Sequence, residues 1–137
     1  MPLSPHLELK ATEAAYMLSG GVLAVDIKQM SDAGPGRPRV YELIRSKKLV
    51  YSPYDPEEEW KTYRQVLQDI RRSGVSKIDC EDIATLVAAE LVTDGIDLEA
   101  RPVVYQSGRT LFHVITHSPK YGYLDACIPA GMGGEAS

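Results

Sequence analysis

The sequence lacks the features that mark secreted, membrane-spanning and nucleic-acid-binding proteins. Two cysteines are too few for a disulfide framework. No stretch approaches the run of about 20 apolar residues that a membrane span requires. The 15 Lys and Arg residues are outnumbered by 19 Asp and Glu, so the formal charge is −4 and no basic face attracts nucleic acid or an anionic membrane. The N-terminus has no basic segment followed by an apolar one, so a cytoplasmic protein with free thiols is expected.

What the sequence does contain fits one soluble globular domain. Of its 137 residues, 44% are hydrophobic and 25% are charged, which is enough apolar material for one packed core. We expect one domain over residues 1–130, made of a helical N-terminal part at 1–73 and a core at 74–130. The glycine-rich segment 131–137 is expected to be a flexible tail.

The N-terminal half is expected to be mainly helical. The expected elements are a helix over 7–31 with a break at Ser19-Gly20-Gly21, a loop over 32–38, a short helix over 39–48, a turn over 52–56 and a helix over 56–73. In the loop, Arg37 and Arg39 could bind an anion, although exposed loop charges usually have no specific role. The last helix should begin at Pro56 and stop at Gly74. Its apolar stripe is more typical of core packing than of a ligand site, and comprises Trp60, Tyr63, Leu67 and Ile70.

The C-terminal half changes from a helical to a strand pattern. Residues 80–93 are apolar around most of a helix circumference, which predicts a buried helix, and Gly95 is expected to cap its end. Three strands are expected over 101–106, 110–116 and 121–125, the first two joined by a hairpin. These elements predict an α+β fold in which N-terminal helices and a central Cys-bearing helix pack on a small antiparallel sheet.

The start of the predicted central helix places a cysteine where a thiolate is favoured. Asp79 is a good N-cap and Asp82 follows at capping-box spacing, so Cys80 lies in the first turn. The unpaired N–H groups and the positive end of the helix dipole favour a thiolate there and could hold an oxyanion. The acidic neighbours, which include Glu81, oppose thiolate formation. We therefore expect Cys80 to need an imidazolium partner.

His113 and Asp125 are the candidates for that partner and its orienting carboxylate. His113 lies inside an apolar strand, where a polar ring is otherwise out of place. Asp125 ends the next strand and could accept a hydrogen bond from the second ring nitrogen of His113, fixing its tautomer. The spacing predicts a Cys80–His113–Asp125 triad.

The sequence resembles the transglutaminase-like superfamily of papain-type cysteine enzymes. The resemblance covers about residues 74–130 and lies in Asp79-Cys80-Glu81-Asp82-Ile83-Ala84 through Leu91, Gly95-Ile96, Phe112-His113-Val114 and Leu124-Asp125. It implies a papain-like core and acyl transfer through a thioester, with Cys80 as nucleophile, His113 as general base and acid, and Asp125 as orienting group. No cofactor is implied, and the substrate is expected to be a protein or peptide amide.

The sequence departs from that family at two places. Many members have Trp where this sequence has Val114 and Tyr123. A second oxyanion donor is expected upstream, and the sequence does not choose among its candidates, which are Trp60, Tyr63 and Gln65. Short members with this acidic opening look like proteins encoded among tailed-phage structural genes. The alternative function is therefore a non-catalytic structural or docking protein of a phage particle.

Each candidate residue also has a purely structural interpretation. Cys80 could be a small buried apolar side chain, His113 a satisfied core histidine, and Asp125 a turn cap. His117 lies on the same strand face as His113 and could replace it as base, although it is expected to be exposed. Cys127 is expected to be structural. A zinc site is disfavoured because no short Cys-x-x-Cys or His-Glu-x-x-His spacing links the available donors, which are Cys80, His113, His117, Asp125 and Cys127.

Overall fold

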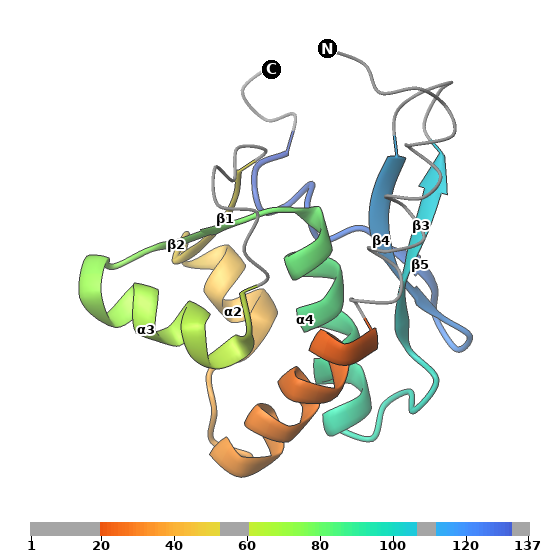
Figure 1. Cartoon of the computed structure of the whole chain (residues 1–137), viewed down its shortest axis with the longest axis horizontal. Helices are drawn as coiled ribbons and strands as arrows, with labels where there is room; N and C mark the ends of the chain where they lie inside the picture. Colours follow the sequence, from red (N-terminus) through yellow and green to blue (C-terminus); the bar gives the residue numbers. More distant parts are fainter. Residues whose placement is uncertain (1–19, 53–60, 107–111, 133–137) are drawn as a thin grey trace.

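The computed structural model describes residues 20–52, 61–106 and 112–132. Its elements are a helix over residues 20–33, α2 (Val40–Arg45), β1 (Leu49–Tyr51), α3 (Tyr63–Ser73), β2 (Ser76–Ile78), α4 (Cys80–Thr93), β3 (Arg101–Gln106), β4 (Phe112–Ser118) and β5 (Gly122–Leu124). Figure 1 shows α4 between the other helices and the β3-β4-β5 sheet. The predicted α+β class is therefore confirmed. No helix in the described part of the chain is both long and apolar enough to span a membrane.

The central helix α4 begins and ends where the sequence predicted. The Asp79 side chain caps its start by accepting a hydrogen bond from the Asp82 N–H at 3.1 Å. At its end, Gly95 has a φ of 70°, and the N–H groups of Gly95 and Ile96 donate to Val92 and Leu91. These two bonds form a Schellman motif, for which the glycine at this position is needed. Most of the helix is buried, as its apolar circumference predicted.

The α4 helix packs on one face of an antiparallel sheet with strand order β3-β4-β5. The register pairs Val104 with Val114 and Thr116 with Leu124. The Thr116 hydroxyl, fully buried, donates to the Ala84 carbonyl of α4 at 2.9 Å. The second predicted strand is observed over Phe112–Ser118 and ends two residues later than expected, while its predicted first residues, 110–111, lie outside the described residues; the third is shortened to Gly122–Leu124. The hairpin connection at 107–111 lies outside the described residues.

Helix α3 begins later than the sequence predicted. Its N-cap is Thr62, whose hydroxyl accepts from the Gln65 N–H, while the Gln65 side chain accepts from the Thr62 N–H at 2.8 Å. This reciprocal capping box fixes the helix start at Tyr63, because Thr62 is extended. The predicted start at Pro56 is therefore wrong for residues 61–62, and 53–60 lie outside the described residues. Gly74 ends the helix in a left-handed conformation, as predicted.

The buried side chains form one continuous apolar cluster. Tyr63 and Val66 of α3 are buried in it, and Leu67 and Ile70 pack against it, so the predicted apolar stripe faces the core; Trp60 lies outside the described residues. The other large members include Met30, Val40, Leu49, Ile83, Leu86 and Val87.

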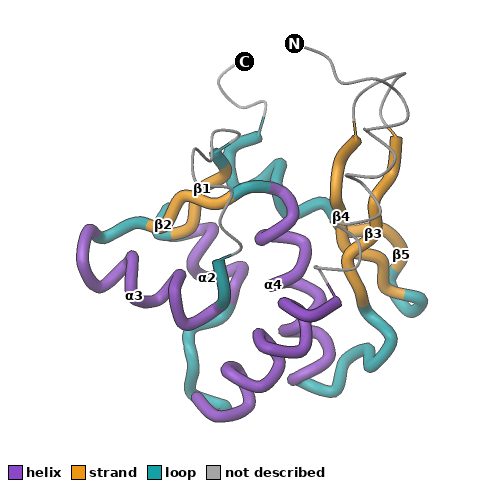
Figure 2. Tube along the Cα trace, viewed as in Figure 1, coloured by secondary structure: helices purple, strands orange, loops and turns teal. Residues whose placement is uncertain are grey.

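A small parallel sheet was not predicted. Strands β1 and β2 pair in parallel, with Leu49 opposite Ser76 and Tyr51 opposite Ile78, and α3 connects them (Figure 2). Each strand has three residues, too few for a readable period-two pattern, and their pairing joins segments far apart in the chain. Because β2 leads directly into α4, this sheet anchors the segment that carries Cys80.

The predicted loop over 32–38 differs from the structure in its first residue and in the exposure of its charges. Helix 20–33 includes Asp32 and Ala33. It also includes Gly20 and Gly21 of the predicted break, so no break lies at these two residues, while Ser19 lies outside the described residues. The Arg37 side chain is buried and pairs with Asp94 at 2.8 Å, and Arg39 also pairs with Asp94. The expectation of exposed loop charges is therefore wrong for Arg37, because its partner lies 57 residues away in sequence and at the end of α4.

The predicted tail is partly ordered. Met132 packs against the core and its N–H donates to the Cys127 carbonyl at 2.9 Å, so residues 131–132 belong to a turn. Residues 133–137 lie outside the described residues.

Candidate active site

Cys80 opens α4 at the end of the helix nearest strand β4. It is half-buried and packs against the apolar cluster. The backbone N–H groups of Val114 and of Cys80 itself lower the pKa of its thiol. The chain neighbour of Val114 is His113, so the packing of α4 on β4 brings the segment containing the predicted base alongside Cys80.

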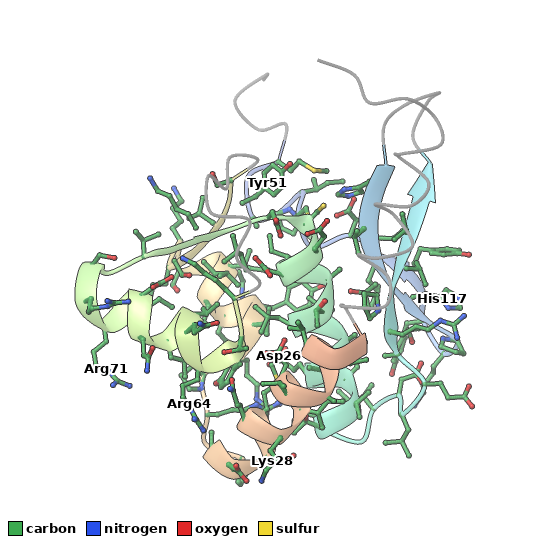
Figure 3. All side chains as sticks on the ribbon, in the orientation of Figure 1. Asp26, Lys28, Tyr51, Arg64, Arg71 and His117 are labelled. Carbon is green, nitrogen blue, oxygen red and sulfur yellow. The ribbon has the colours of Figure 1, made fainter. Side chains whose placement is uncertain are left out.

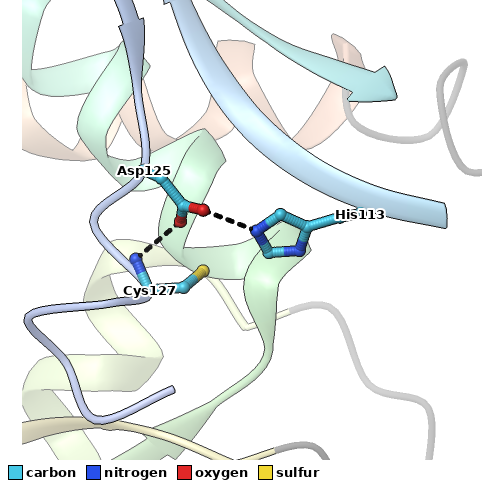
Figure 4. A group of neighbouring side chains, drawn as sticks. All are labelled: His113, Asp125 and Cys127. Atoms are coloured by element: carbon cyan, nitrogen blue, oxygen red, sulfur yellow. Dashed lines mark hydrogen bonds and ion pairs between the residues drawn. The ribbon is translucent and has the colours of Figure 1, made fainter. Parts of the chain in front are cut away.

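His113 and Asp125 make the contact that the sequence predicted. Nε2 of His113 lies 2.9 Å from Oδ2 of Asp125, and both side chains are largely buried (Figure 4). Asp125 follows the last residue of β5, so the antiparallel turn between β4 and β5 returns the chain to His113. An ionised carboxylate on Nε2 holds the ring proton there and leaves Nδ1 as the basic nitrogen. The pair therefore has the chemistry of an oriented imidazole base.

Cys127 joins this pair, which the sequence did not predict. The Cys127 N–H donates to Oδ1 of Asp125 at 3.1 Å, forming a turn two residues long. The ligand atoms of His113, Asp125 and Cys127 all lie within 4.8 Å of one another. Cys127 is buried, as expected for a structural cysteine, yet its sulfur lies beside the imidazole and the carboxylate.

The surroundings of Cys80 oppose its ionisation. Burial above all, and the carboxylates of Asp79 and Glu81, raise the pKa of its thiol to about 11 against the lowering effect of the Val114 and Cys80 N–H groups. The pKa of Cys127 is also raised, first by burial and then by negative charge on Cys80 and Asp125. The two thiols are thus electrostatic neighbours. The helix start alone does not supply a thiolate at neutral pH, as the acidic flanking residues led us to expect.

A pair of acidic side chains lies just outside Cys80. Burial, followed by the charge of Asp79 and a hydrogen bond to it, raises the pKa of Asp82 to about 9. The Lys61 N–H donates to Oδ1 of Asp82 at 3.1 Å. Asp82 is therefore neutral at pH 7, which leaves the carboxylates of Asp79 and Glu81 as the negative charges that act on Cys80.

The remaining predicted candidates lie elsewhere. His117 is half-buried, and its ring is 4.7 Å from that of Tyr123 toward the end of β4 (Figure 3), whereas His113 lies near the start of that strand. Tyr63 donates from its hydroxyl to the Pro38 carbonyl, and Gln65 serves the α3 capping box, so neither is placed as an oxyanion donor. Both cysteines are free thiols.

Arg37 and Arg39 border an open hollow of about 660 Å³ at the opposite end of α4 from Cys80. Asp94 pairs with both guanidinium groups there. The hollow is therefore separate from the group around His113.

No family model matches the sequence, and neither a curated protein nor a solved structure is significantly similar to it.

Proposed function

We propose that the protein is a transglutaminase-like cysteine hydrolase or acyl transferase that acts on amide or peptide bonds. The observation that carries this proposal is the 2.9 Å contact between His113 Nε2 and Asp125 Oδ2, next to Val114, whose N–H lowers the pKa of the Cys80 thiol. A carboxylate-oriented imidazole beside a helix-opening cysteine is the arrangement that nucleophilic thiol catalysis requires.

The proposed reaction uses the three side chains in sequence. His113 Nδ1 takes the proton of the Cys80 thiol as the sulfur attacks the carbonyl carbon of the substrate. The amide C–N bond then breaks, and the imidazolium gives its proton to the departing amine. Water, or the amine of a second substrate, attacks the thioester and releases Cys80. Asp125 stabilises the imidazolium throughout.

The raised thiol pKa makes the imidazole essential to this mechanism. With a pKa near 11, Cys80 is a protonated thiol at neutral pH unless its proton passes to His113. Reactivity of Cys80 should therefore depend on His113 far more than on the helix dipole.

Alkylation tests the proposal. The native protein is treated with limiting iodoacetamide from pH 5 to pH 9, and the labelled peptides are quantified by mass spectrometry. We expect Cys80 to be labelled rapidly below pH 8, and at least about tenfold more slowly in His113→Ala, because a general base contributes two or more orders of magnitude. His117→Ala is the matched control and should label like the unaltered protein.

A p-nitrophenyl ester provides a second readout, since it acylates an active thiol and releases a coloured product. A burst of nitrophenolate with the acyl group on Cys80, lost in Cys80→Ser, would support acyl transfer. Labelling of Cys80 at the rate of an ordinary thiol, unaffected by His113→Ala, would contradict the proposal.

A second candidate function is a non-catalytic structural or docking protein of a phage particle. The observation that favours it is the high thiol pKa set by burial and by Asp79 and Glu81. An inert thiol needs no imidazole, so this function predicts slow labelling of Cys80 at every pH below 9 and no acyl intermediate.

A further inference from the structure

We propose that His113, Asp125 and Cys127 bind a zinc ion. The three side chains come from β4 and from the turn that follows β5 (Figure 4). Their ligand atoms lie within 4.8 Å of one another, although sequence spacing disfavoured a metal site. Only the return of the chain after β5 brings the three donors together, which is why the spacing between residues did not indicate it.

The distances between the three ligand atoms suit a tetrahedral ion after small shifts of the side chains. Zinc bonds of about 2.0–2.3 Å place neighbouring ligand atoms about 3.3–3.8 Å apart. The existing 2.9 Å contact between His113 and Asp125 must widen slightly, because zinc takes the place of the shared proton. Cys127 must approach by at most about 1 Å, since no two ligand atoms are more than 4.8 Å apart.

The donor set selects the metal. Imidazole, carboxylate and thiolate are the three ligand types of protein zinc sites, whereas Ca²⁺ and Mg²⁺ require oxygen ligands. Three protein ligands leave a fourth position for water or another thiol.

The surroundings support the ligands and leave a route to them. The Cys127 N–H holds Oδ1 of Asp125 in place at 3.1 Å, the kind of outer hydrogen bond that orients a metal-binding carboxylate. The side chains of His113 and Asp125 retain exposed fractions of 12% and 21%, so an ion can enter from solvent.

Bound zinc would occupy the imidazole and carboxylate that thiol catalysis uses, and would therefore inhibit it. This consequence rests on the proposed function. Zinc binding itself does not, because it is measured without turnover, so either idea can fail while the other stands.

Cobalt and zinc titrations of the full chain, freed of metal with a chelator, test the site. Co²⁺ should produce a thiolate-to-cobalt charge-transfer band and the intense visible bands of a tetrahedral centre. One equivalent of Zn²⁺ should abolish both bands, and a large excess of Mg²⁺ or Ca²⁺ should not. Zinc affinity is then measured by competition with a chromophoric chelator.

Matched variants identify the ligands. Cys127→Ser and His113→Ala should lower zinc affinity at least about tenfold, and Cys127→Ser should lose the charge-transfer band. Cys80→Ser and His117→Ala are the controls and should retain both. Because Cys127 is buried, Asp125→Asn is included as an isosteric variant that keeps an acceptor for the Cys127 N–H. It should also lower zinc affinity, with unchanged circular dichroism.

Two outcomes would overturn the proposal. One is the absence of any saturable charge-transfer band in the unaltered protein. The other is a band that persists in Cys127→Ser but disappears in Cys80→Ser, since the metal would then be bound elsewhere.

Discussion

Asp26 shows how a single buried carboxylate can make stability depend on pH. Its Oδ1 accepts from the Tyr63 N–H at 2.8 Å, at the start of α3. Its Oδ2 is buried and has no hydrogen-bond partner among the described residues. Burial raises the pKa of Asp26 to about 7, partly offset by the Tyr63 hydrogen bond. The folded protein therefore binds a proton that the unfolded chain releases near pH 4.

Asp26→Asn should make the protein more stable at pH 8 and change its pH dependence. A raised folded-state pKa contributes stability below the unfolded value of 3.8, and this contribution is lost as pH rises through about 7. The free energy of unfolding should fall by about 2–3 kcal/mol more in the unaltered protein than in Asp26→Asn between pH 5 and pH 8. Urea denaturation at both pH values measures this difference. Asp32→Asn, on the exposed side of the same helix, should show no such change.

At the same scale, the sequence predicted one contact of the candidate site and missed another for definable reasons. The His113–Asp125 contact followed from two adjacent strands, a local arrangement that residue patterns indicate. Cys127 was missed as its neighbour, because the position of the sulfur depends on the turn after β5. The spacing of Asp125 and Cys127 indicates only the hydrogen bond between them within that turn, and not the position of the sulfur relative to His113.

Among the elements, helix α3 has two plausible starts in its sequence, and the capping box decides between them. Pro56 and the acidic residues after it resemble a helix start, but Thr62 and Gln65 satisfy each other's N–H groups. Gln29 and Asp26 of the neighbouring helix accept the next N–H donors, from Arg64 and Tyr63. The helix therefore begins where its exposed donors find acceptors.

Thr62→Ala should lower the free energy of unfolding by about 1 kcal/mol, the usual cost of removing an N-cap hydroxyl. Thr62→Ser retains the hydroxyl and should cost only a few tenths of that. Chemical denaturation of the two variants measures the difference. Equal stabilities would mean that Asp26 and Gln29 hold the helix start without the Thr62 side chain.

Helix α4 was predicted to the residue because both of its boundaries are local. Asp79 and Gly95 fix its ends through hydrogen bonds that span at most five residues. The parallel pairing of β1 and β2 was not predicted, since it joins residues 49–51 to 76–78 across a helix. Short strands of this kind are specified by their tertiary partners more than by their own sequence.

For the whole molecule, one buried ion network joins the N-terminal segment to the end of α4. Arg37 lies 2.8 Å from Asp94 and 3.9 Å from Glu90, and its side chain is 2% exposed. Glu90 also accepts the Val40 N–H at 2.9 Å, at the start of α2. Residues 37–40 are thus held to α4 through charges that water does not screen.

Arg37→Met should destabilise the protein by about 3–5 kcal/mol, because it leaves buried negative charge without its closest cation. Arg39→Met is the matched control. Arg39 pairs with the same Asp94, but its side chain is 36% exposed, so its removal should cost about 1 kcal/mol or less. Thermal and urea unfolding compare the two. Similar losses in both variants would show that burial of the guanidinium does not determine the strength of the network.

Strand β1 also connects two parts of the molecule that meet at the sulfurs. The Ser52 N–H donates to the Ile78 carbonyl, just before Cys80, and the Tyr51 N–H donates to the Ala130 carbonyl, three residues after Cys127. Local opening of this three-residue strand would release both segments in a single event. Substitutions in β1 would therefore alter the exposure of both cysteines together. The distance between the two thiols thus depends on a strand that contains neither of them.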